Sequence, residues 1–232
     1  MSALSSHTPH LFKRNSPSLY CILDLGYTRE QDAEAVTESL LMGGADLLQL
    51  RAKGHDLATI QRVAEKLLPL CRAARIPFIL NDHPALAAEI GADGVHIGQD
   101  DGSLAEAREI LGKNSPADTS GTPPSFLIGR STHSLAQARA ALAEGFDYIG
   151  FGPLFPTPTK LGRPGIGLEE IAVMERDVGA HIPAFCIGGI TPETLPSVLA
   201  AGARRVVIVS ALLKAVNIQS ATQSAKQQLH PE

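Results

Sequence analysis

The chain has few of the residues that mark disulfide-bonded, metal-binding or nucleic-acid-binding proteins. Its only cysteines are Cys21, Cys71 and Cys186, an odd number without the spacing of a metal site or a disulfide framework. We interpret all three as buried core residues of a protein from a reducing compartment, which predicts a cytoplasmic location. The 20 basic residues are outnumbered by 24 acidic ones, so no basic field is available for nucleic acid or an anionic membrane surface.

Long apolar runs are missing as well. No run reaches the ~18 residues that would suggest a membrane-spanning helix, and we expect no membrane partner. Residues 1–18 are polar and lack the apolar core of a signal peptide, so we interpret them as an N-terminal tail. The first turn after a strand-like run lacks the GxGxxG fingerprint of a dinucleotide-binding fold. What remains, with 44% hydrophobic and 19% charged residues, is the composition of a globular protein.

Eight short apolar runs alternate with helical patterns along the chain. Most runs are rich in Val, Ile, Leu and Phe without a polar alternation, which is typical of strands buried on both faces. In the clearest helical segment, apolar residues from Leu57 to Cys71 recur with i, i+3, i+4 spacing behind the candidate N-cap Asp56. The runs begin near Leu19, Asp46, Pro77, Gly94, Phe126, Tyr148, Ala184 and Arg205.

Local motifs mark the ends of the predicted helices. The spacing of a capping box occurs in residues 28–31, 103–106 and 134–137. A Gly-x-Asp motif recurs at residues 44–46, 91–93 and 145–147, with a degenerate copy at 202–204. Glycine suits the left-handed turn that ends a helix before a strand, so the repeat indicates successive βα units.

Eight βα units predict a single-domain α/β protein. We expect a closed (β/α)8 TIM barrel over residues 19–218, with the active site at the C-terminal ends of the strands. The polar residues 219–232 are expected to form a C-terminal tail that frays after the last helix.

Two cations and an amide follow the run that begins near Asp46. Gln49, Arg51 and Lys53 alternate along the chain, so their side chains can point into one cavity. This combination suits a polyanion, because the arginine fork can bind two phosphate oxygens. The alternative is a solvated loop with stray charges.

Carboxylates end the next two runs. Asp82 follows Asn81, and Asp101 follows the run that begins near Gly94. Carboxylates at the ends of neighbouring strands can share a Mg²⁺ ion whose other ligands are water and substrate phosphate oxygens. Asp82 could instead cap the following helix. His96 lies in the same run as Asp101, and we interpret it as the source of an orienting hydrogen bond and not as a general base.

Two further strand ends carry hydroxyls and a lone cation. Ser131 begins a Ser-Thr-His sequence whose hydroxyls and backbone N–H groups suit either a phosphate or a helix cap. Segment 152–160 contains three prolines, Pro153, Pro156 and Pro158, which predict a stiff, extended loop. That loop would carry Thr157, Thr159 and Lys160 over an anionic ligand, although an exposed turn is the alternative. The glycine-rich residues that follow, 162–167, predict a flexible lid.

The last two runs predict a second anion site. Gly188 and Gly189 allow the backbone to approach a phosphate, and Val209 and Ser210 end the eighth run. Loops after the seventh and eighth strands of a barrel often bind phosphate through backbone N–H groups. The C-terminal end of the barrel would then bind a monophosphate at one side and, with the help of Mg²⁺, a diphosphate at the other. We infer a transfer by direct displacement, since no Ser or Cys nucleophile has a visible base.

Together and in order, these motifs resemble the thiamine-phosphate synthase family. The resemblance covers about residues 19–213, and segments 152–160 and 93–101 are its most distinctive parts. The segments that carry it are 49–53, 81–82, 93–101, 131–133, 152–160 and 187–190. The resemblance implies a Mg²⁺-dependent transferase of thiamine biosynthesis. Such an enzyme condenses hydroxymethylpyrimidine diphosphate with hydroxyethylthiazole phosphate and gives thiamine phosphate and diphosphate.

The resemblance also implies roles for individual residues. In the family, departure of diphosphate leaves a pyrimidine-methyl cation that the thiazole nitrogen captures. Arg51, Ser131 and Lys160 match the catalytic positions beside the leaving diphosphate. Asp82 and Asp101 match the Mg²⁺ ligands. The pyrimidine diphosphate site matches Gln49, Arg51, Lys53, Asn81, Ser131 and Lys160, and the thiazole phosphate site matches Thr157, Thr159, Gly188, Gly189, Val209 and Ser210.

Two departures from the family pattern and two rival functions remain. Residues 112–125 look longer than the usual connection, and Arg130 stands where we expect a small or apolar residue. A thiazole tautomerase would share the barrel and the thiazole phosphate end, but would lack the set of Asp82, Asp101 and Lys160. A non-catalytic phosphate-binding barrel would not need polar residues on six strand ends. The expected partners are two phosphorylated small molecules, and the sequence leaves open whether the chain forms a homo-oligomer.

Overall fold

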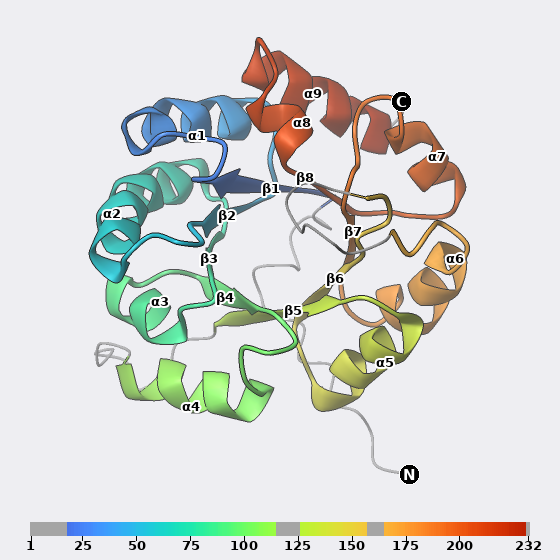
Figure 1. Ribbon diagram of the computed structural model, residues 1–232, viewed down its shortest axis with the longest axis horizontal. Coiled ribbons are helices and arrows are strands. Elements are labelled where there is room, and N and C mark those ends of the chain that lie inside the picture. Colours follow the sequence, from blue (N-terminus) through green and yellow to red (C-terminus); the bar gives the residue numbers. More distant parts are fainter. Residues whose placement is uncertain (1–17, 115–125, 157–164, 231–232) are drawn as a thin grey trace.

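The computed structural model describes residues 18–114, 126–156 and 165–230, and shows a closed barrel of eight parallel strands (Figure 1). Neighbouring strands pair in chain order, and the last strand returns to pair with the first. The strands are β1 (Leu19–Asp24), β2 (Leu47–Arg51), β3 (Phe78–Asn81), β4 (Gly94–Ile97), β5 (Leu127–Thr132), β6 (Tyr148–Phe151), β7 (Ala184–Ile187) and β8 (Val206–Ile208). Each begins within one residue of the apolar run that predicted it, so the barrel prediction is confirmed.

Helices surround the barrel on its outside (Figure 1). They are α1 (Ala33–Met42), α2 (Leu57–Ala74), α3 (Pro84–Ile90), α4 (Leu104–Asn114), α5 (Leu135–Glu144), α6 (Ile171–Met174), α7 (Leu195–Ala200), α8 (Ser210–Leu213) and α9 (Ile218–Leu229). A short 3₁₀ helix, Glu30–Asp32, precedes α1, and a π-helical turn, Glu175–Gly179, extends α6. Among the helices that the structure describes, none is both long and apolar enough to cross a membrane.

Aromatic rings fill the N-terminal half of the barrel interior. Tyr20 of β1 packs edge to face against Tyr148 of β6 and Phe185 of β7, with ring centroids 5.9 and 5.3 Å away. All three side chains are buried, with exposed fractions of at most 2%. Because this aromatic layer closes one half of the interior, only the C-terminal ends of the strands are left to form a pocket.

The repeated Gly-x-Asp motif joins neighbouring strands at the N-terminal end of the barrel. Its glycines end helices with positive φ angles, for example 97° at Gly44, which glycine adopts without steric cost. Each aspartate then accepts a hydrogen bond from the backbone at the start of the preceding strand. These bonds join Asp46 to Leu19, Asp93 to Phe78 and Asp147 to Ile128, with N···O distances of 2.8–2.9 Å. The motif therefore aligns three pairs of strands.

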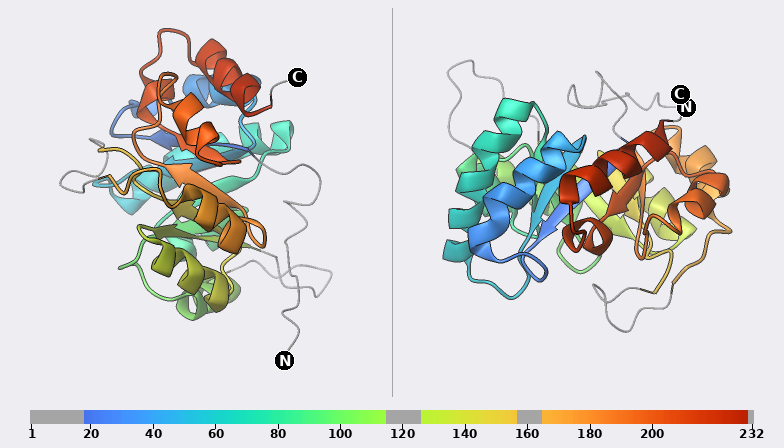
Figure 2. Two further views of the ribbon diagram at one scale, coloured as in Figure 1. Left: turned by 90° about the vertical axis from the view of Figure 1, so that its right-hand side faces the viewer. Right: turned by 90° about the horizontal axis from the view of Figure 1, so that it is seen from above.

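The C-terminal segment 219–232 does not fray as we expected. Most of it belongs to α9, which packs against α1 on the outside of the barrel (Figures 1 and 2). Thr222 of this helix is fully buried, and Lys226 Nζ lies 2.5 Å from Asp46 Oδ2. The prediction of a frayed tail was therefore wrong, because these two side chains and the apolar residues of the same helix hold it against the rest of the protein.

Candidate active site

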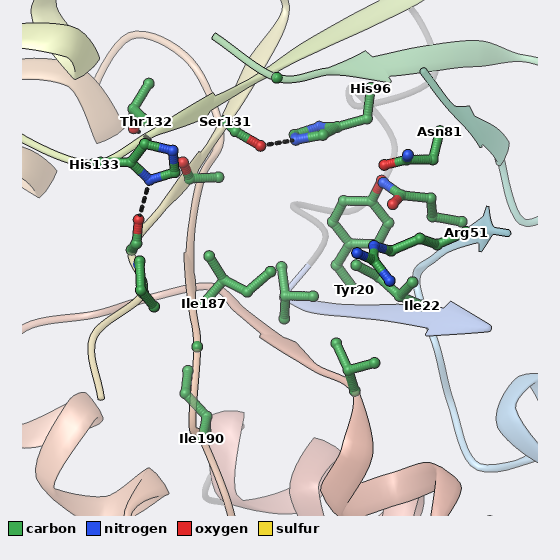
Figure 3. Close-up of a pocket in the computed structure, with 18 of the residues that line it drawn as sticks. Tyr20, Ile22, Arg51, Asn81, His96, Ser131, Thr132, His133, Ile187 and Ile190 are labelled. Atoms are coloured by element: carbon green, nitrogen blue, oxygen red, sulfur yellow. Dashed lines mark hydrogen bonds between the residues drawn. The ribbon is translucent and has the colours of Figure 1, made fainter. Parts of the chain in front are cut away.

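A pocket lies at the C-terminal ends of the strands (Figure 3). Every predicted site residue within the described ranges lines it, namely Gln49, Arg51, Lys53, Asn81, Asp82, Asp101, Ser131, Gly188, Gly189, Val209 and Ser210. The remaining three, Thr157, Thr159 and Lys160, lie outside the described residues. The barrel thus brings together side chains that are far apart in the sequence.

Arg51 is oriented by a carboxylate that the sequence analysis did not single out. Its Nη1 lies 2.5 Å from Oδ2 of Asp24, which is the residue opposite Arg51 in the β1–β2 register. The Asp24 side chain is only 2% exposed, whereas that of Arg51 is 18% exposed. A guanidinium has five N–H donors, so Arg51 keeps donors for an anion in the pocket while Asp24 fixes its position.

Asp82 and Asp101 place two carboxylates together at the edge of the pocket. Burial raises the pKa of Asp82, Lys53 Nζ at 3.2 Å opposes this shift, and the negative charge of Asp101 raises the pKa further. Asp101 Oδ2 also accepts a hydrogen bond from Gly98 N at 2.8 Å. Asp82 does not cap α3, because the N-cap residue of that helix is His83. The pair is therefore a local excess of negative charge that a cation would neutralise.

This pair of carboxylates fits a magnesium ion. Mg²⁺ binds proteins through one or two carboxylates and completes its octahedral shell with water and substrate phosphate oxygens. Within the described part of the chain, no group of three or more His, Cys, Asp or Glu side chains is arranged to hold a metal ion. Asp82 and Asp101 would therefore hold the ion together with a phosphorylated substrate and not alone.

Ser131 is fixed through both its side chain and its backbone. His96 Nε2 lies 3.0 Å from Ser131 Oγ (Figure 3), and the other ring nitrogen of His96 lies 3.3 Å from Tyr148 Oη. The carbonyl oxygen of Ser131 accepts a hydrogen bond from Gln99 Nε2 at 2.6 Å. These contacts support the interpretation of His96 as an orienting residue.

Arg130, the departure from the family pattern, forms hydrogen bonds with the backbone of the loop that follows β4. Its Nη1 donates to the carbonyl of Gly102 at 2.6 Å, and its Nη2 donates to the carbonyl of Gln99 at 3.1 Å. The guanidinium also lies over the Phe146 ring, 5.4 Å from its centroid. Since Asp101 lies in the bonded loop, Arg130 helps to position one of the two predicted metal ligands.

Gly188 and Gly189 lie against the loop that follows β6. Their φ angles are 101° and 68°, and a Cβ on Gly188 would lie only 2.4 Å from the Cα of Pro153. His133 Nδ1 donates to the carbonyl of Gly152, 2.5 Å away, at the start of the same loop (Figure 3). The glycines therefore allow this loop to approach β7 closely, in addition to lining the pocket. Of the predicted lid, residues 162–164 lie outside the described residues.

Sequence reasoning missed three polar residues of the site. Tyr20 and Tyr148 are two of the three tyrosines in the chain, and each lies in an apolar run. A polar hydroxyl in a strand buried on both faces needs a partner, which was the available signal. Asp24 ends the first run in the same way that Asp82 follows the third, so the rule applied to Asp82 would have found it.

Known proteins are similar to this chain in sequence and fold. The chain matches the family described as thiamine monophosphate synthase over residues 19–212. It is 41% identical to the thiamine-phosphate synthase of Thermus thermophilus, over 84% of this chain and 87% of the relative. It is 38% identical to that of Nitrosococcus oceani, over 90% of this chain and 91% of the relative. A thiamine phosphate pyrophosphorylase structure from Pyrococcus furiosus has a TM-score of 0.79 and 30% identity, over 93% of this chain and 96% of that one.

The family match begins at the first residue of β1 and ends within α8. It therefore includes every residue that lines the pocket. With relatives this similar over most of both chains, the chain belongs to the thiamine monophosphate synthase family.

Proposed function

We propose that this chain, a transferase of that family, condenses hydroxymethylpyrimidine diphosphate with hydroxyethylthiazole phosphate in a reaction that requires Mg²⁺. The products would be thiamine phosphate and diphosphate. Support comes from the named relatives and from the residues that face the pocket. A cytoplasmic location is part of the proposal, and the three free, buried cysteines are compatible with a reducing compartment.

One observation carries the proposal: a single pocket has two differently built sides. Arg51, Lys53 and the pair of Asp82 and Asp101 lie on the β2–β4 side, where cations and a bound metal suit a diphosphate. The glycine pair at 188–189 lies on the β7–β8 side, where exposed backbone suits a monophosphate. Two phosphorylated substrates would therefore bind face to face.

The residues present suit a dissociative displacement. The bond between the pyrimidine methylene carbon and the diphosphate oxygen breaks, and its electron pair leaves with the diphosphate. Arg51, held by Asp24, and the Ser131 hydroxyl would donate hydrogen bonds to the charge that develops there. Bound Mg²⁺ would neutralise part of the same charge. The thiazole nitrogen then supplies the electron pair of the new C–N bond, and no proton has to be removed by a base.

A paired-substrate assay tests the proposed reaction. Purified protein would receive both phosphorylated halves, with Mg²⁺ or with excess chelator, and thiamine phosphate would be measured by chromatography. We expect product only when both substrates and Mg²⁺ are present. Folded protein that binds thiazole phosphate but makes no product would shift the assignment to a tautomerase of the same barrel.

An Asp82→Ala variant tests the metal assignment. Removing this carboxylate should nearly abolish turnover, because one of two predicted Mg²⁺ ligands is lost. Binding of thiazole phosphate on the β7–β8 side should remain, and calorimetry measures it. Near-normal turnover in this variant would disprove the metal-binding role of Asp82.

A further inference from the structure

A series of polar side chains crosses the barrel interior and ends at Ser131, and four of its five members line the pocket. Gln49 Nε2 lies 2.5 Å from Tyr20 Oη, which lies 3.2 Å from Tyr148 Oη. His96 continues the series, with Nδ1 3.3 Å from Tyr148 Oη and Nε2 3.0 Å from Ser131 Oγ. These five residues, here called the relay, come from five different strands.

We propose that the relay holds His96 as the neutral Nε2–H tautomer, which makes His96 and Tyr148 positioning residues for Ser131. In this state Ser131 Oγ accepts a hydrogen bond from His96, and the serine hydrogen is left to be donated to an oxygen of the leaving diphosphate. The inference rests on the function proposed above, in which Ser131 faces that diphosphate.

The direction of the hydrogen bonds is set at the buried end of the relay. The amide nitrogen of Gln49 can only donate, so the Tyr20 oxygen accepts. Gln49 and Tyr20 are each 2% exposed, and a buried hydroxyl hydrogen requires an acceptor. The Tyr20 hydrogen therefore points to the Tyr148 oxygen. With its oxygen accepting from Tyr20, Tyr148 can donate its own hydrogen to Nδ1 of His96, 3.3 Å away.

The imidazole carries this direction to the serine. A neutral imidazole has a hydrogen on one ring nitrogen only, so Nε2 donates when Nδ1 accepts. Ser131 lines the pocket, and its hydroxyl hydrogen can rotate toward a ligand there. With the opposite direction, Ser131 would donate to His96 and turn its lone pairs toward the diphosphate. An anion is bound by donors, so only the first arrangement supports the proposed reaction.

The barrel leaves room for the relay at one position of β5. A Cβ on Gly129 would lie 2.1 Å from Cζ of Tyr148 and 2.6 Å from Nδ1 of His96. These distances are shorter than any tolerable contact, so a side chain at 129 would displace one of the two rings. The contact between Tyr148 and His96 therefore depends on glycine at this position.

Two substitutions of His96 separate the relay from simple packing. In His96→Gln the amide nitrogen reaches the region of Nε2 and can donate to Ser131, whereas in His96→Asn it reaches only the region of Nδ1. We expect His96→Asn to lower kcat about 10²-fold, as loss of one donor to developing charge does elsewhere. The KM for thiazole phosphate should be unchanged. His96→Gln should restore most of kcat, and equal losses in both variants would overturn the proposal.

Nitrogen NMR of the histidine rings in substrate-free protein measures the tautomer directly. We expect the signals of His96, identified by their absence from His96→Gln protein, to show a protonated Nε2 and an unprotonated Nδ1. Tyr148→Phe keeps the ring but removes the hydroxyl, so it should allow both tautomers. An Nδ1–H tautomer or a doubly protonated ring in the unaltered protein would overturn the proposal.

Binding of inorganic diphosphate with Mg²⁺ keeps this test separate from the test of the reaction. In calorimetry, His96→Asn should weaken diphosphate binding, and His96→Gln should bind like the unaltered protein. Protein that shows this pattern but makes no thiamine phosphate would disprove the proposed reaction and support the relay. Active protein in which His96→Asn binds diphosphate as tightly as the unaltered protein would overturn the relay.

Discussion

Asp82 combines a left-handed backbone, with φ of 64°, and a carboxyl group whose pKa is raised by burial and by Asp101. A raised pKa in the folded state means that folding disfavours the ionised form, so the charge of Asp82 destabilises the metal-free protein at neutral pH. The ion pair with Lys53 offsets little of this, because the lysine side chain is 57% exposed. Ionised Asp82 therefore lowers the free energy of unfolding of the metal-free protein, and a bound cation would offset this loss.

Asp82→Asn should stabilise the metal-free protein and inactivate the enzyme. Asparagine has the same shape and tolerates a positive φ, but it carries no charge. Thermal unfolding should show a higher Tm for the variant at pH 7. The gain should disappear below about pH 4, the ordinary pKa of aspartate, where both side chains are neutral. Mg²⁺ added together with inorganic diphosphate should raise the Tm of the unaltered protein more than that of the variant. A lower Tm for the variant at pH 7 without these additions would contradict this account.

Arg130→Ala should raise the Mg²⁺ concentration needed for half-maximal activity. Two carbonyl groups of the loop that carries Asp101 would lose their donor, at a cost of about 0.5–1.5 kcal/mol each. A loss of about 1.4 kcal/mol in positioning corresponds to a tenfold higher requirement. Arg139→Ala is the matched control, since Arg139 pairs with Asp177 on the surface and does not line the pocket. The same Mg²⁺ requirement in both variants would show that the loop keeps its position without Arg130.

At the scale of elements, the start of each strand could be predicted because both faces of a barrel strand are buried. Three helix starts were also predicted correctly, at Asp56, Ser103 and Ser134, where the side chain accepts the expected backbone bond. The capping box at residues 28–31 was wrong, because the backbone N–H of Thr28 donates to Asp24 O and a 3₁₀ turn precedes α1. The spacing of Thr28 and Gln31 in the sequence cannot show that the Thr28 N–H already has another acceptor in the preceding turn.

The Gly-x-Asp motif gives a prediction at the same scale. Asp93→Ala removes the acceptor for Phe78 N at the start of β3 and should lower the free energy of unfolding by about 1–3 kcal/mol. Asp93→Asn keeps an oxygen acceptor and should lose less. Chemical denaturation measures both variants, and kcat should be unchanged because this end of the barrel is opposite the pocket. Equal stability of the two variants would show that the hydrogen bond contributes little.

The candidate site could be predicted where its residues end strands or alternate with a residue that does, and not where they lie elsewhere inside. Arg51 and Asp82 were identified because they end or follow strands, and Gln49, inside β2, was identified because it alternates with Arg51. Tyr20 and Tyr148 could not be linked in this way, since their hydrogen bond joins residues 128 positions apart. Which strand interiors face each other depends on the register of the closed barrel, and no single segment contains that information.

For the whole molecule, α9 completes the outer layer between α7 and α1 (Figure 1). Its sequence is polar on average, but Ile218, Ala221, Ala225 and Leu229 recur at helical spacing and pack against the core, a pattern that our sequence analysis missed. The helix also approaches α1 closely at Gly43, where a Cβ would lie 2.4 Å from Cβ of Thr222.

Gly43→Ala tests this docking. Gly43 has a helical φ of −76°, so alanine is acceptable to its backbone and only the clash with α9 disfavours it. Overpacking of this kind should lower the free energy of unfolding by about 1–3 kcal/mol. Gly112→Ala is the control, because its Cβ would meet nothing within 4 Å. That variant should gain up to about 1 kcal/mol from helix propensity. Equal effects of the two changes would mean that α9 can move away at no cost.

Beside Asp46, Lys226 also contacts Ser18 Oγ at 3.0 Å, and His230 Nε2 lies 2.8 Å from the same oxygen. Ser18 and His230 are 212 positions apart, so the earliest described residue to leave the ribosome meets one of the last. During synthesis, the edge of β1 that pairs with β8 therefore has no strand partner until β8 has been made. The barrel therefore cannot close during synthesis until β8 is available, and until then this edge of β1 is open to pairing with other strands.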